Sequence, residues 1–175
     1  MNTSTPLPKK QSTTPRLCFV EASYIKYMHN IDYRISVKYN NRPFVVLTIP
    51  INEYLYAIPL TSTTNAMRKA QGKKPRANIV TTKIMDGDTE IADLLYNNMF
   101  PVTEDLITDI MIDPIVDTYL SNEERYLRKH WEKINFKAVA VYQARTNQSH
   151  RNHTFLEAVC CDFKKLESSL LQYIS

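Results

Sequence analysis

Glycine is scarce in this chain of 175 residues, which contains only Gly72 and Gly87. The glycine-rich loops that bind dinucleotides or nucleoside triphosphates need several glycines at fixed spacing, so both kinds of site are excluded. Long apolar runs are also missing, because none approaches the roughly 18 residues of a membrane-spanning helix. No apolar segment typical of a signal peptide follows the N-terminus. We therefore expect a soluble protein of the cytoplasm.

Cysteine is rare too, and its three copies do not form the pattern of a secreted disulfide framework. Cys18 stands alone, whereas Cys160 and Cys161 are adjacent and follow His150 and His153. Neighbouring side chains of a helix diverge by about 100°, so the adjacent pair cannot easily ligate one zinc ion. We expect no metal site and no cofactor, and we interpret this pair as buried residues of the final helix.

Basic and acidic residues are separated along the chain. Residues 1–85 carry 13 Lys and Arg against three acids, whereas residues 86–175 carry nine against 15. Six cations follow one another without an acidic neighbour: Arg68, Lys69, Lys73, Lys74, Arg76 and Lys83. A chain polarised in this way offers a polyanion one attractive face, and we expect the acidic half to point away from it. A solvated basic loop is the alternative.

The N-terminal half is predicted to be rich in strands. Residues 1–16 are rich in Ser, Thr, Pro and Lys, so we expect a flexible tail before a single domain over residues 17–175. Apolar and β-branched runs predict strands at Leu17–Ala22, Pro43–Ile49, Glu53–Leu60, Ile79–Met85, Thr89–Tyr96 and Met99–Val102. Pro50–Asn52 is expected to form a turn, and Asp86–Asp88 contains the glycine that a tight hairpin needs.

Helices are expected mainly toward the C-terminus. Ser121 with Glu124 and Thr154 with Glu157 match the capping box, and apolar residues at helical spacing follow each pair. A short helix is also expected after Ser23, and a loop at residues 68–76, whereas residues 106–119 fit a strand or a helix. Strands followed by helices predict an α+β domain with an antiparallel sheet.

Four successive hydroxyl residues at 61–64 connect a predicted strand to the basic segment. Hydroxyl and loop N–H groups bind phosphate, and the nearby cations would supply the counter-charge. A Ser/Thr turn without a ligand is the alternative. The chain has four histidines: His29, His130, His150 and His153. None of them lies near a nucleophile in the sequence, so no catalytic triad is favoured.

Several short elements occur in an order that resembles one known family: Ser23–Tyr27, Arg42–Phe44, Tyr56–Ser62, Asn97–Val102 and a late helix over Glu124–Arg145. They resemble the ToxN/AbiQ endoribonuclease toxins of type III toxin–antitoxin systems, and the resemblance runs from about Leu17 to the C-terminus. It implies a strongly twisted antiparallel β-sheet core like that of MazF and CcdB, with packed helices and a helical C-terminal part.

The resemblance also implies an activity. We expect metal-independent, sequence-selective cleavage of single-stranded RNA that leaves 2′,3′-cyclic phosphate and 5′-hydroxyl ends. A small, repeat-derived structured RNA antitoxin would inhibit the toxin in a higher-order protein–RNA assembly, within abortive infection, antiviral defence and growth arrest. A non-catalytic RNA-binding module that uses the same basic groove is the alternative.

Taken residue by residue, the resemblance places the groove tyrosine of the family at Tyr24 and its strand-opening lysine at Arg42. Its Thr-Ser pair falls on Thr61 and Ser62. The lysine that follows this pair in the family falls on Thr64, and a hydroxyl is too weak an acid to exchange protons readily near neutral pH.

Lys69 is the nearest titratable cation after the hydroxyl run, and we expect it to fold back over this run and to donate the proton to the leaving 5′-oxygen. Contact with phosphate alone is the alternative. The remaining candidates for RNA binding are Lys26, Arg68, Lys73, Lys74 and Arg76. Asp105, Asp109 and Asp117 belong to the acidic half and are expected to be dispensable for cleavage.

Overall fold

The computed structural model describes residues 14–49 and 52–175. The strands of this part are β1 (Arg16–Val20), β2 (Phe44–Thr48), β3 (Leu55–Thr61), β4 (Thr81–Asp86), β5 (Thr89–Leu95), β6 (Phe100–Val102) and β7 (Ile107–Asp109). The helices are α1 (Ala22–Ile31), α2 (Asn65–Ala70), α3 (Thr118–Lys129), α4 (Trp131–Thr146), α5 (His153–Val159) and α6 (Phe163–Ile174), with 3₁₀ turns η1 (Val37–Tyr39), η2 (Tyr96–Asn98) and η3 (Glu104–Leu106). Most of the predicted tail and of the turn at Pro50–Asn52 lies outside the described residues, and Arg16 already belongs to β1.

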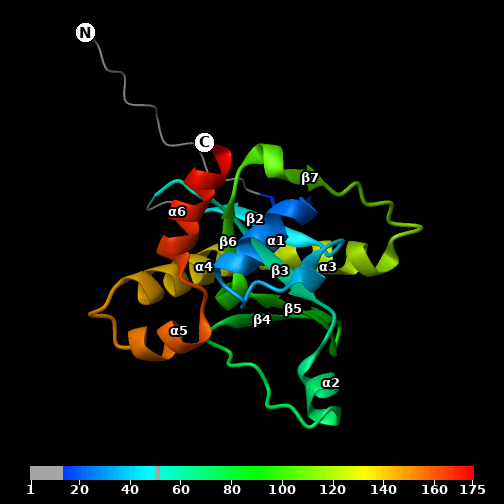
Figure 1. The fold of residues 1–175 in the computed structure, drawn as a ribbon. Helices are drawn as coiled ribbons and strands as arrows, with labels where there is room; N and C mark the ends of the chain where they lie inside the picture. Colours follow the sequence, from blue (N-terminus) through cyan, green and yellow to red (C-terminus); the bar gives the residue numbers. More distant parts are fainter. Residues whose placement is uncertain (1–13, 50–51) are drawn as a thin grey trace.

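The strands form an antiparallel sheet in the order β4-β5-β3-β2-β1-β7, and β6 also pairs with β3. Figure 1 shows α1 across the sheet, α4, α5 and α6 to one side, and α2 projecting from the end that carries β4 and β5. α3 packs against β4, and α6 packs against β6. The predicted α+β class with an antiparallel sheet and a helical C-terminal part is confirmed, whereas the likeness to MazF and CcdB stays a prediction.

The centre of the sheet follows the apolar pattern of the sequence. Four of the five residues of β2 are buried, as expected for a strand covered on both faces. β3 changes partners along its length, because its first residues pair with β6 and its last two, Leu60 and Thr61, pair with Leu94 and Asp93 of β5. This exchange brings the end of β3 beside an acidic residue of β5.

The predicted hairpin between β4 and β5 is confirmed. Asp86 pairs with Thr89, so Gly87 and Asp88 form a two-residue turn. Gly87 has a φ of 59°, a left-handed conformation that glycine adopts without the steric cost of a Cβ atom.

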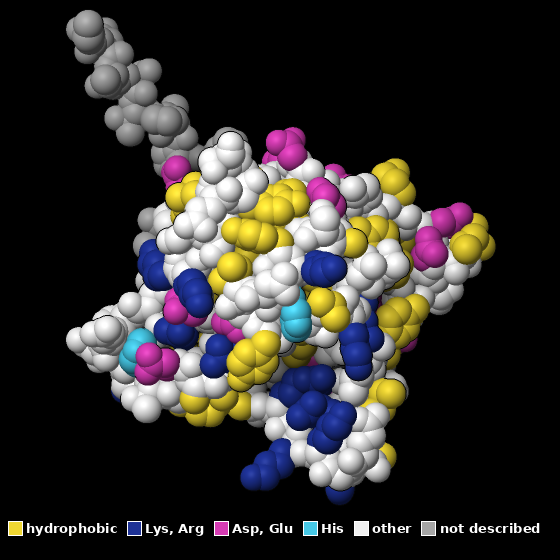
Figure 2. Space-filling view, viewed as in Figure 1, with side chains coloured by type: hydrophobic (Ala, Val, Ile, Leu, Met, Phe, Trp, Pro, Cys, Tyr) yellow, Lys and Arg dark blue, Asp and Glu magenta, His cyan; other side chains and the backbone are white. Residues whose placement is uncertain are grey.

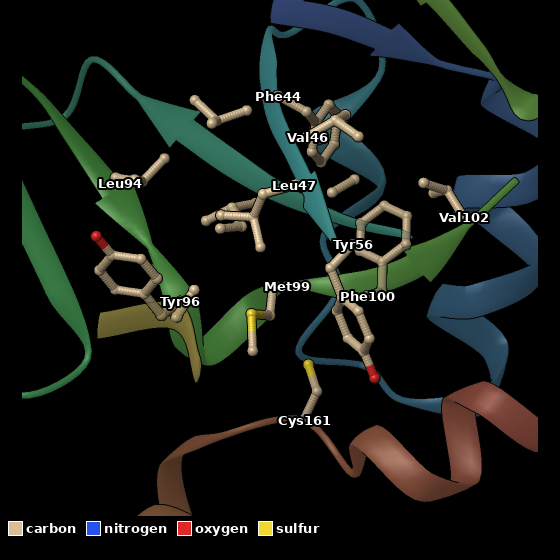
Figure 3. Packing of buried hydrophobic residues seen from close by; sticks show 14 of the residues in the cluster. Phe44, Val46, Leu47, Tyr56, Leu94, Tyr96, Met99, Phe100, Val102 and Cys161 are labelled. Carbon is tan, nitrogen blue, oxygen red and sulfur yellow. The ribbon is translucent and has the colours of Figure 1, made fainter. Parts of the chain in front are cut away.

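Aromatic rings form much of the core on the helical side of the sheet. Figure 3 shows the rings of Phe44, Phe100 and Tyr56 close together, with Tyr56 directed toward the segment that carries Cys161. The ring centroids of Phe44 and Phe100 are 5.5 Å apart, and those of Tyr56 and Phe163 of α6 are 5.9 Å apart. Edge-on rings at this spacing add to the stabilisation from burial, so the C-terminal helices are part of the same core as the sheet.

Cys160 and Cys161 are buried, as predicted, but they lie between α5 and α6 rather than on one final helix. The amide of Cys161 donates to the carbonyl of Asn97, 2.9 Å away, which ties this connection to η2. Burial raises the pKa of Cys160 to about 12, so its thiol stays protonated. Within the described chain, no three His, Cys, Asp or Glu side chains gather as metal ligands.

The predicted helix starts lie two to four residues too late. Ser23 and Ser121 lie inside α1 and α3, because these helices begin at Ala22 and Thr118. Thr154 lies inside α5, and the last predicted helix is two helices, with Asp162 capping α6 through the amide of Lys165 at 3.1 Å. No helix of the described residues is long and apolar enough to cross a membrane.

Glu123 provides a test of this packing. Its side chain is 2% exposed on α3, and burial raises its pKa from 4.5 to about 7. The folded state therefore binds the proton more tightly than the unfolded state, and its stability falls as pH rises from about 4.5 through about 7. Glu123→Gln should leave the free energy of unfolding nearly unchanged at pH 4 and raise it by about 2 kcal/mol at pH 8.

Chemical denaturation at a series of pH values measures this effect. Glu132→Gln, which removes an exposed carboxylate from α4, is the control. A stability difference for Glu123→Gln that does not change with pH would contradict the raised pKa of Glu123.

Candidate active site

A groove of about 440 Å³ lies where β3 ends, between η1, α2 and η2. Its walls combine four cations with hydroxyl and amide groups: Ser36, Lys38, Tyr39, Arg42, Thr61, Thr63, Arg68, Arg76, Leu95, Asn97 and Asn98. No carboxylate of the described residues is among these walls. Such a lining attracts an anion and offers it several hydrogen-bond donors.

The turn before β2 positions Arg42. Asn41 has a φ of 62°, a left-handed conformation that Asn tolerates better than most residues. The amide of Arg42 donates to the carbonyl of Tyr39 at 3.1 Å, which closes the turn after η1. The guanidinium Nη1 then lies 3.4 Å from Oγ1 of Thr61, in a long hydrogen bond. Arg42 and Thr61 are therefore neighbours in the groove although 19 positions separate them in the sequence.

Two hydroxyls of the predicted phosphate-binding run have structural partners. Oγ1 of Thr61 accepts from the amide of Thr63 at 3.2 Å, which bends the chain away from β3. Thr64 is buried, and its Oγ1 accepts from the amide of Met67 at 3.3 Å as the N-cap of α2. The Ser/Thr turn and the phosphate-binding interpretation are therefore compatible, because Thr61 and Thr63 still line the groove.

Arg76 connects three parts of this wall. Its Nη1 donates to the carbonyl of Thr63 at 2.6 Å and to Oδ2 of Asp93 at 2.7 Å. Its amide donates to Oδ1 of Asn65, at the start of α2, at 3.0 Å. The other carboxylate oxygen of Asp93 is buried without a hydrogen-bond partner in the described part of the chain. Burial and the nearby Glu90 raise the pKa of Asp93 to about 6, against the opposite effect of Arg76.

Tyr39 presents its hydroxyl to the opposite wall. Nδ2 of Asn98 donates to this hydroxyl at 2.7 Å. Asn98 of η2 therefore fixes the position of the Tyr39 ring, which belongs to η1. Burial raises the pKa of Tyr39, and its phenol therefore stays protonated. A protonated phenol beside Arg42 and Lys38 can donate a hydrogen bond to a bound anion.

The basic segment is partly helical. The predicted loop over residues 68–76 is wrong at its beginning, because α2 includes Arg68 and Lys69, and the chain continues irregularly only after Ala70. Figure 2 shows Lys and Arg side chains gathered over α2 and the segment after it, while Asp and Glu lie mainly elsewhere on this face. A short helix capped by Thr64 therefore turns Arg68 toward the groove.

The structure brings together four of the sequence-predicted residues: Arg42, Thr61, Arg68 and Arg76. It leaves six outside the groove: Tyr24, Lys26, Ser62, Lys69, Lys73 and Lys74. Ser62 is exposed between two groove residues and lies at the rim. Lys69 is exposed on α2 beside Arg68, and successive helical side chains diverge by about 100°. The expectation that Lys69 folds back over the hydroxyl run is therefore not supported.

The structure places Tyr24 outside the groove lining. This residue is 0% exposed, and its hydroxyl donates to the carbonyl of Pro101 at 2.6 Å. Its ring packs against those of Phe100 and Tyr173, with centroids 6.1 and 4.9 Å away. Tyr24 therefore belongs to the core between α1, β6 and α6.

Sequence reasoning missed the residues of η1 and η2. Tyr39 and Lys38 come from a polar stretch without apolar periodicity, so the hydrophobic pattern gave no direction for their side chains. Asn97 and Asn98 were noted only as part of a short element that carries the family resemblance. The signal available for Tyr39 was its position three residues before Arg42, which a tight turn would bring to the same wall.

The acidic half does not point away from the groove entirely. Asp93 belongs to that half and is 0% exposed. It lies directly behind the cations of the groove, because its carboxylate accepts a hydrogen bond from Arg76. Oε1 of Glu90 accepts from the amide of Asn65 at 3.1 Å and so anchors the start of α2. The two acids of β5 therefore support the groove from behind.

Arg76 and Asp93 allow a test of this support. Arg76→Ala would leave a buried carboxylate unpaired, so we expect the free energy of unfolding near pH 7 to fall by about 3 kcal/mol. Asp93→Asn in the Arg76→Ala background should restore part of this loss, as a double-mutant cycle measures. Lys73→Ala is the matched control, because its side chain is exposed. Equal losses in the free energy of unfolding for Arg76→Ala and Lys73→Ala would show that the Arg76–Asp93 pair does not stabilise the fold.

Comparisons with known proteins agree on one family. A family model described as the toxin ToxN of type III toxin–antitoxin systems matches residues 16–171. The endoribonuclease ToxN of Bacillus thuringiensis subsp. kurstaki is 29% identical over 171 residues, which cover 91% of this chain and 84% of that protein.

Solved structures give the same result. A type III toxin that a non-coding RNA pseudoknot selectively inhibits has a TM-score of 0.81 at 29% identity, over 93% of this chain and 99% of the other. The lactococcal anti-phage endoribonuclease AbiQ shares the fold with a TM-score of 0.75 at 23% identity, over 91% and 98%. The chain therefore belongs to the ToxN family of toxins from type III toxin–antitoxin systems.

Proposed function

We propose that this protein is an endoribonuclease toxin that cleaves single-stranded RNA in the groove at the end of β3. The observation that carries this proposal is the convergence of Lys38, Arg42, Arg68 and Arg76 on one groove without a lining carboxylate. Cations in this arrangement fit a phosphodiester. The family membership supports the same conclusion, since relatives in it are named endoribonucleases.

The reaction we propose needs no metal ion. The 2′-hydroxyl oxygen of the RNA forms a bond to the adjacent phosphorus, and the bond from phosphorus to the 5′-oxygen breaks. The proton of the 2′-hydroxyl passes to solvent, while the leaving 5′-oxygen receives a proton from the enzyme, which then regains one from solvent. The products are a 2′,3′-cyclic phosphate and a 5′-hydroxyl, and the enzyme supplies positioning, charge stabilisation and proton transfer.

The groove residues divide these tasks. Arg42, whose planar guanidinium can donate two parallel hydrogen bonds, contacts the non-bridging oxygens together with the hydroxyl of Thr61. Tyr39, held by Asn98, positions the substrate, the part that a groove tyrosine would otherwise take at Tyr24. Ser62 meets the RNA at the rim of the groove.

Lys38 is the proton donor in this proposal. It is the only lysine that lines the groove among the described residues, and the other three cations of the walls are arginines. A guanidinium keeps its proton under ordinary conditions, whereas an ammonium group can release one. Thr64 cannot serve, because its hydroxyl caps α2 and is a very weak acid.

The biological setting is part of the proposal. A structured RNA antitoxin, as for the solved toxin that an RNA pseudoknot inhibits, would occupy the same groove and compete with substrate. Lys26, Lys73 and Lys74 lie outside the groove on exposed surface and would guide either RNA toward it. Release of the toxin from a higher-order assembly would arrest growth and limit phage infection, as expected for an anti-phage system.

Purified protein with a labelled, A-rich single-stranded RNA in EDTA tests the proposal. We expect cleavage with cyclic phosphate and 5′-hydroxyl ends. Binding without cleavage would favour the alternative, a non-catalytic RNA-binding module. Cleavage only after addition of Mg²⁺ would contradict the mechanism.

Three variants separate the residue roles in the same assay. With saturating RNA, Lys38→Ala should slow cleavage by about 10²–10⁴-fold, as for loss of a general acid. Arg42→Ala should slow it by about 10²–10³-fold through the lost phosphate contact. Lys69→Ala is the matched control and should cleave at nearly the wild-type rate. Should Lys69→Ala be the inactive variant and Lys38→Ala the active one, the assignment of the proton donor is wrong.

The exposed basic residues should affect binding rather than chemistry. Neutralising Lys73 and Lys74 should weaken RNA binding and reduce the slope of log K against log salt concentration by about 1.4 for single-stranded RNA. The maximal cleavage rate should remain, because neither residue lines the groove. An unchanged slope in a salt titration would show that this segment is only a solvated surface.

A further inference from the structure

A second hollow of about 1,510 Å³ lies over α3, α4 and α5, and it shares no residue with the groove. We name it the helical basic surface. Its charged and aromatic lining consists of Arg128, Lys129, His130, Trp131, Glu132, Lys133, Phe136, Lys137, His150 and Arg151. The lining has five Lys and Arg against one acid, so it also favours a negatively charged partner.

The charge of this surface comes from a basic stretch of sequence, although the C-terminal half as a whole carries more acids than bases. Residues 125–156 contain seven Lys and Arg and a single acid, Glu132. The remaining acids of the half lie before or after this stretch. The helical basic surface is therefore a positive region within a negative half of the chain.

Several of these cations are available to a ligand. Lys129, Lys133 and Arg151 are exposed, and no carboxylate of the described residues forms an ion pair with them. Arg128 is paired with Glu124, and Lys137 donates to the carbonyls of Asn78 and Thr81, so both have structural roles. Three unpaired cations around one hollow are a suitable site for several phosphates.

An exposed aromatic ring lies among the cations of the helical basic surface. Phe136 is 78% exposed on α4, one turn beyond Lys133. An exposed phenyl ring beside cations is the arrangement with which proteins bind single-stranded nucleic acid, since the ring stacks on a base while the cations contact the backbone. Trp131 lines the same hollow but is only 7% exposed, so it forms part of the wall.

The helical basic surface adjoins the groove. Arg76 lines the groove and Ile79 lines this surface. Only two residues lie between them, so their Cα atoms are no more than about 11 Å apart. Figure 1 shows the segment between α2 and β4 running from α2 toward α5. The two linings therefore come close to each other at this segment.

From these observations we infer that the helical basic surface is a second RNA-binding surface, which holds the part of a long RNA that extends beyond the cleavage groove. The inference rests on RNA being the ligand of the groove, as proposed above. A short RNA fills the groove alone, whereas a longer RNA gains contacts to Lys129, Lys133 and Phe136. The length of the RNA thus determines how much of the protein it contacts.

Two 2′-O-methylated A-rich oligonucleotides, one short and one long, test the inference by binding without cleavage, since they lack the attacking hydroxyl. Lys129→Gln with Lys133→Gln should weaken the long oligonucleotide about tenfold and reduce its salt slope by about 1.4, while the short one is unaffected. Phe136→Ala should weaken the long oligonucleotide about tenfold, and Phe136→Trp should restore it.

Arg125→Gln with Lys165→Gln is the control, because it removes two exposed cations outside the surface. Equal weakening by the control pair, equal weakening of both oligonucleotides, or no effect of Phe136→Ala would overturn the inference. A change in oligomeric state of the RNA-free variants would overturn it as well, since it would show an interface between copies. Failure of wild-type protein to cleave unmodified short RNA would refute the proposed function instead, and the binding ratios would still be measurable.

Discussion

The ion pair between Arg76 and Asp93 is the interaction on which the groove depends. Its atoms are 2.7 Å apart, and the Asp93 side chain is 1% exposed. A buried carboxylate is costly unless it is paired, so this cation is held in one place and can also bind the carbonyl of Thr63. The backbone amide of Arg76 donates to Oδ1 of Asn65. The end of β3 and the start of α2 are thereby fixed relative to each other, and they carry the hydroxyls and Arg68 of the groove.

The arrangement of charge follows from the same constraint. A groove for a polyanion needs several cations close together, and their mutual repulsion would spread them over a flexible surface. Here Asp93 and Glu90 lie behind the walls on β5, where they anchor Arg76 and α2 without lining the groove. The acids hold the cationic elements in position while the surface that faces the ligand stays positive. Separation of charge along the sequence is thus only partly a separation in space.

Much of the sheet could be predicted from local pattern, because β-branched runs and a glycine turn act over a few residues. Helix starts were harder, since Ser121 and Thr154 match a capping box yet lie within helices that Asp117 and Asn152 precede. The residues of the groove could be found from the sequence where strand ends and hydroxyls position them, at Arg42 and Thr61. The groove was missed at Tyr39, because a tyrosine in a polar turn and one on an apolar helix face, such as Tyr24, differ only through tertiary packing.

The residue at position 64 shows how the groove differs from the pattern that the resemblance implied. Thr64 is bound to the amide of Met67, so its side chain stabilises α2 and is turned away from proton transfer. A lysine at this position could not cap the helix, because an ammonium group has no hydrogen-bond acceptor for the amide. The cap in turn directs Arg68 into the groove, and η1 contributes Lys38 from the other side. The positive charge of the groove is therefore maintained by elements on both walls, and the proposed mechanism assigns proton transfer to Lys38 of η1 for this reason.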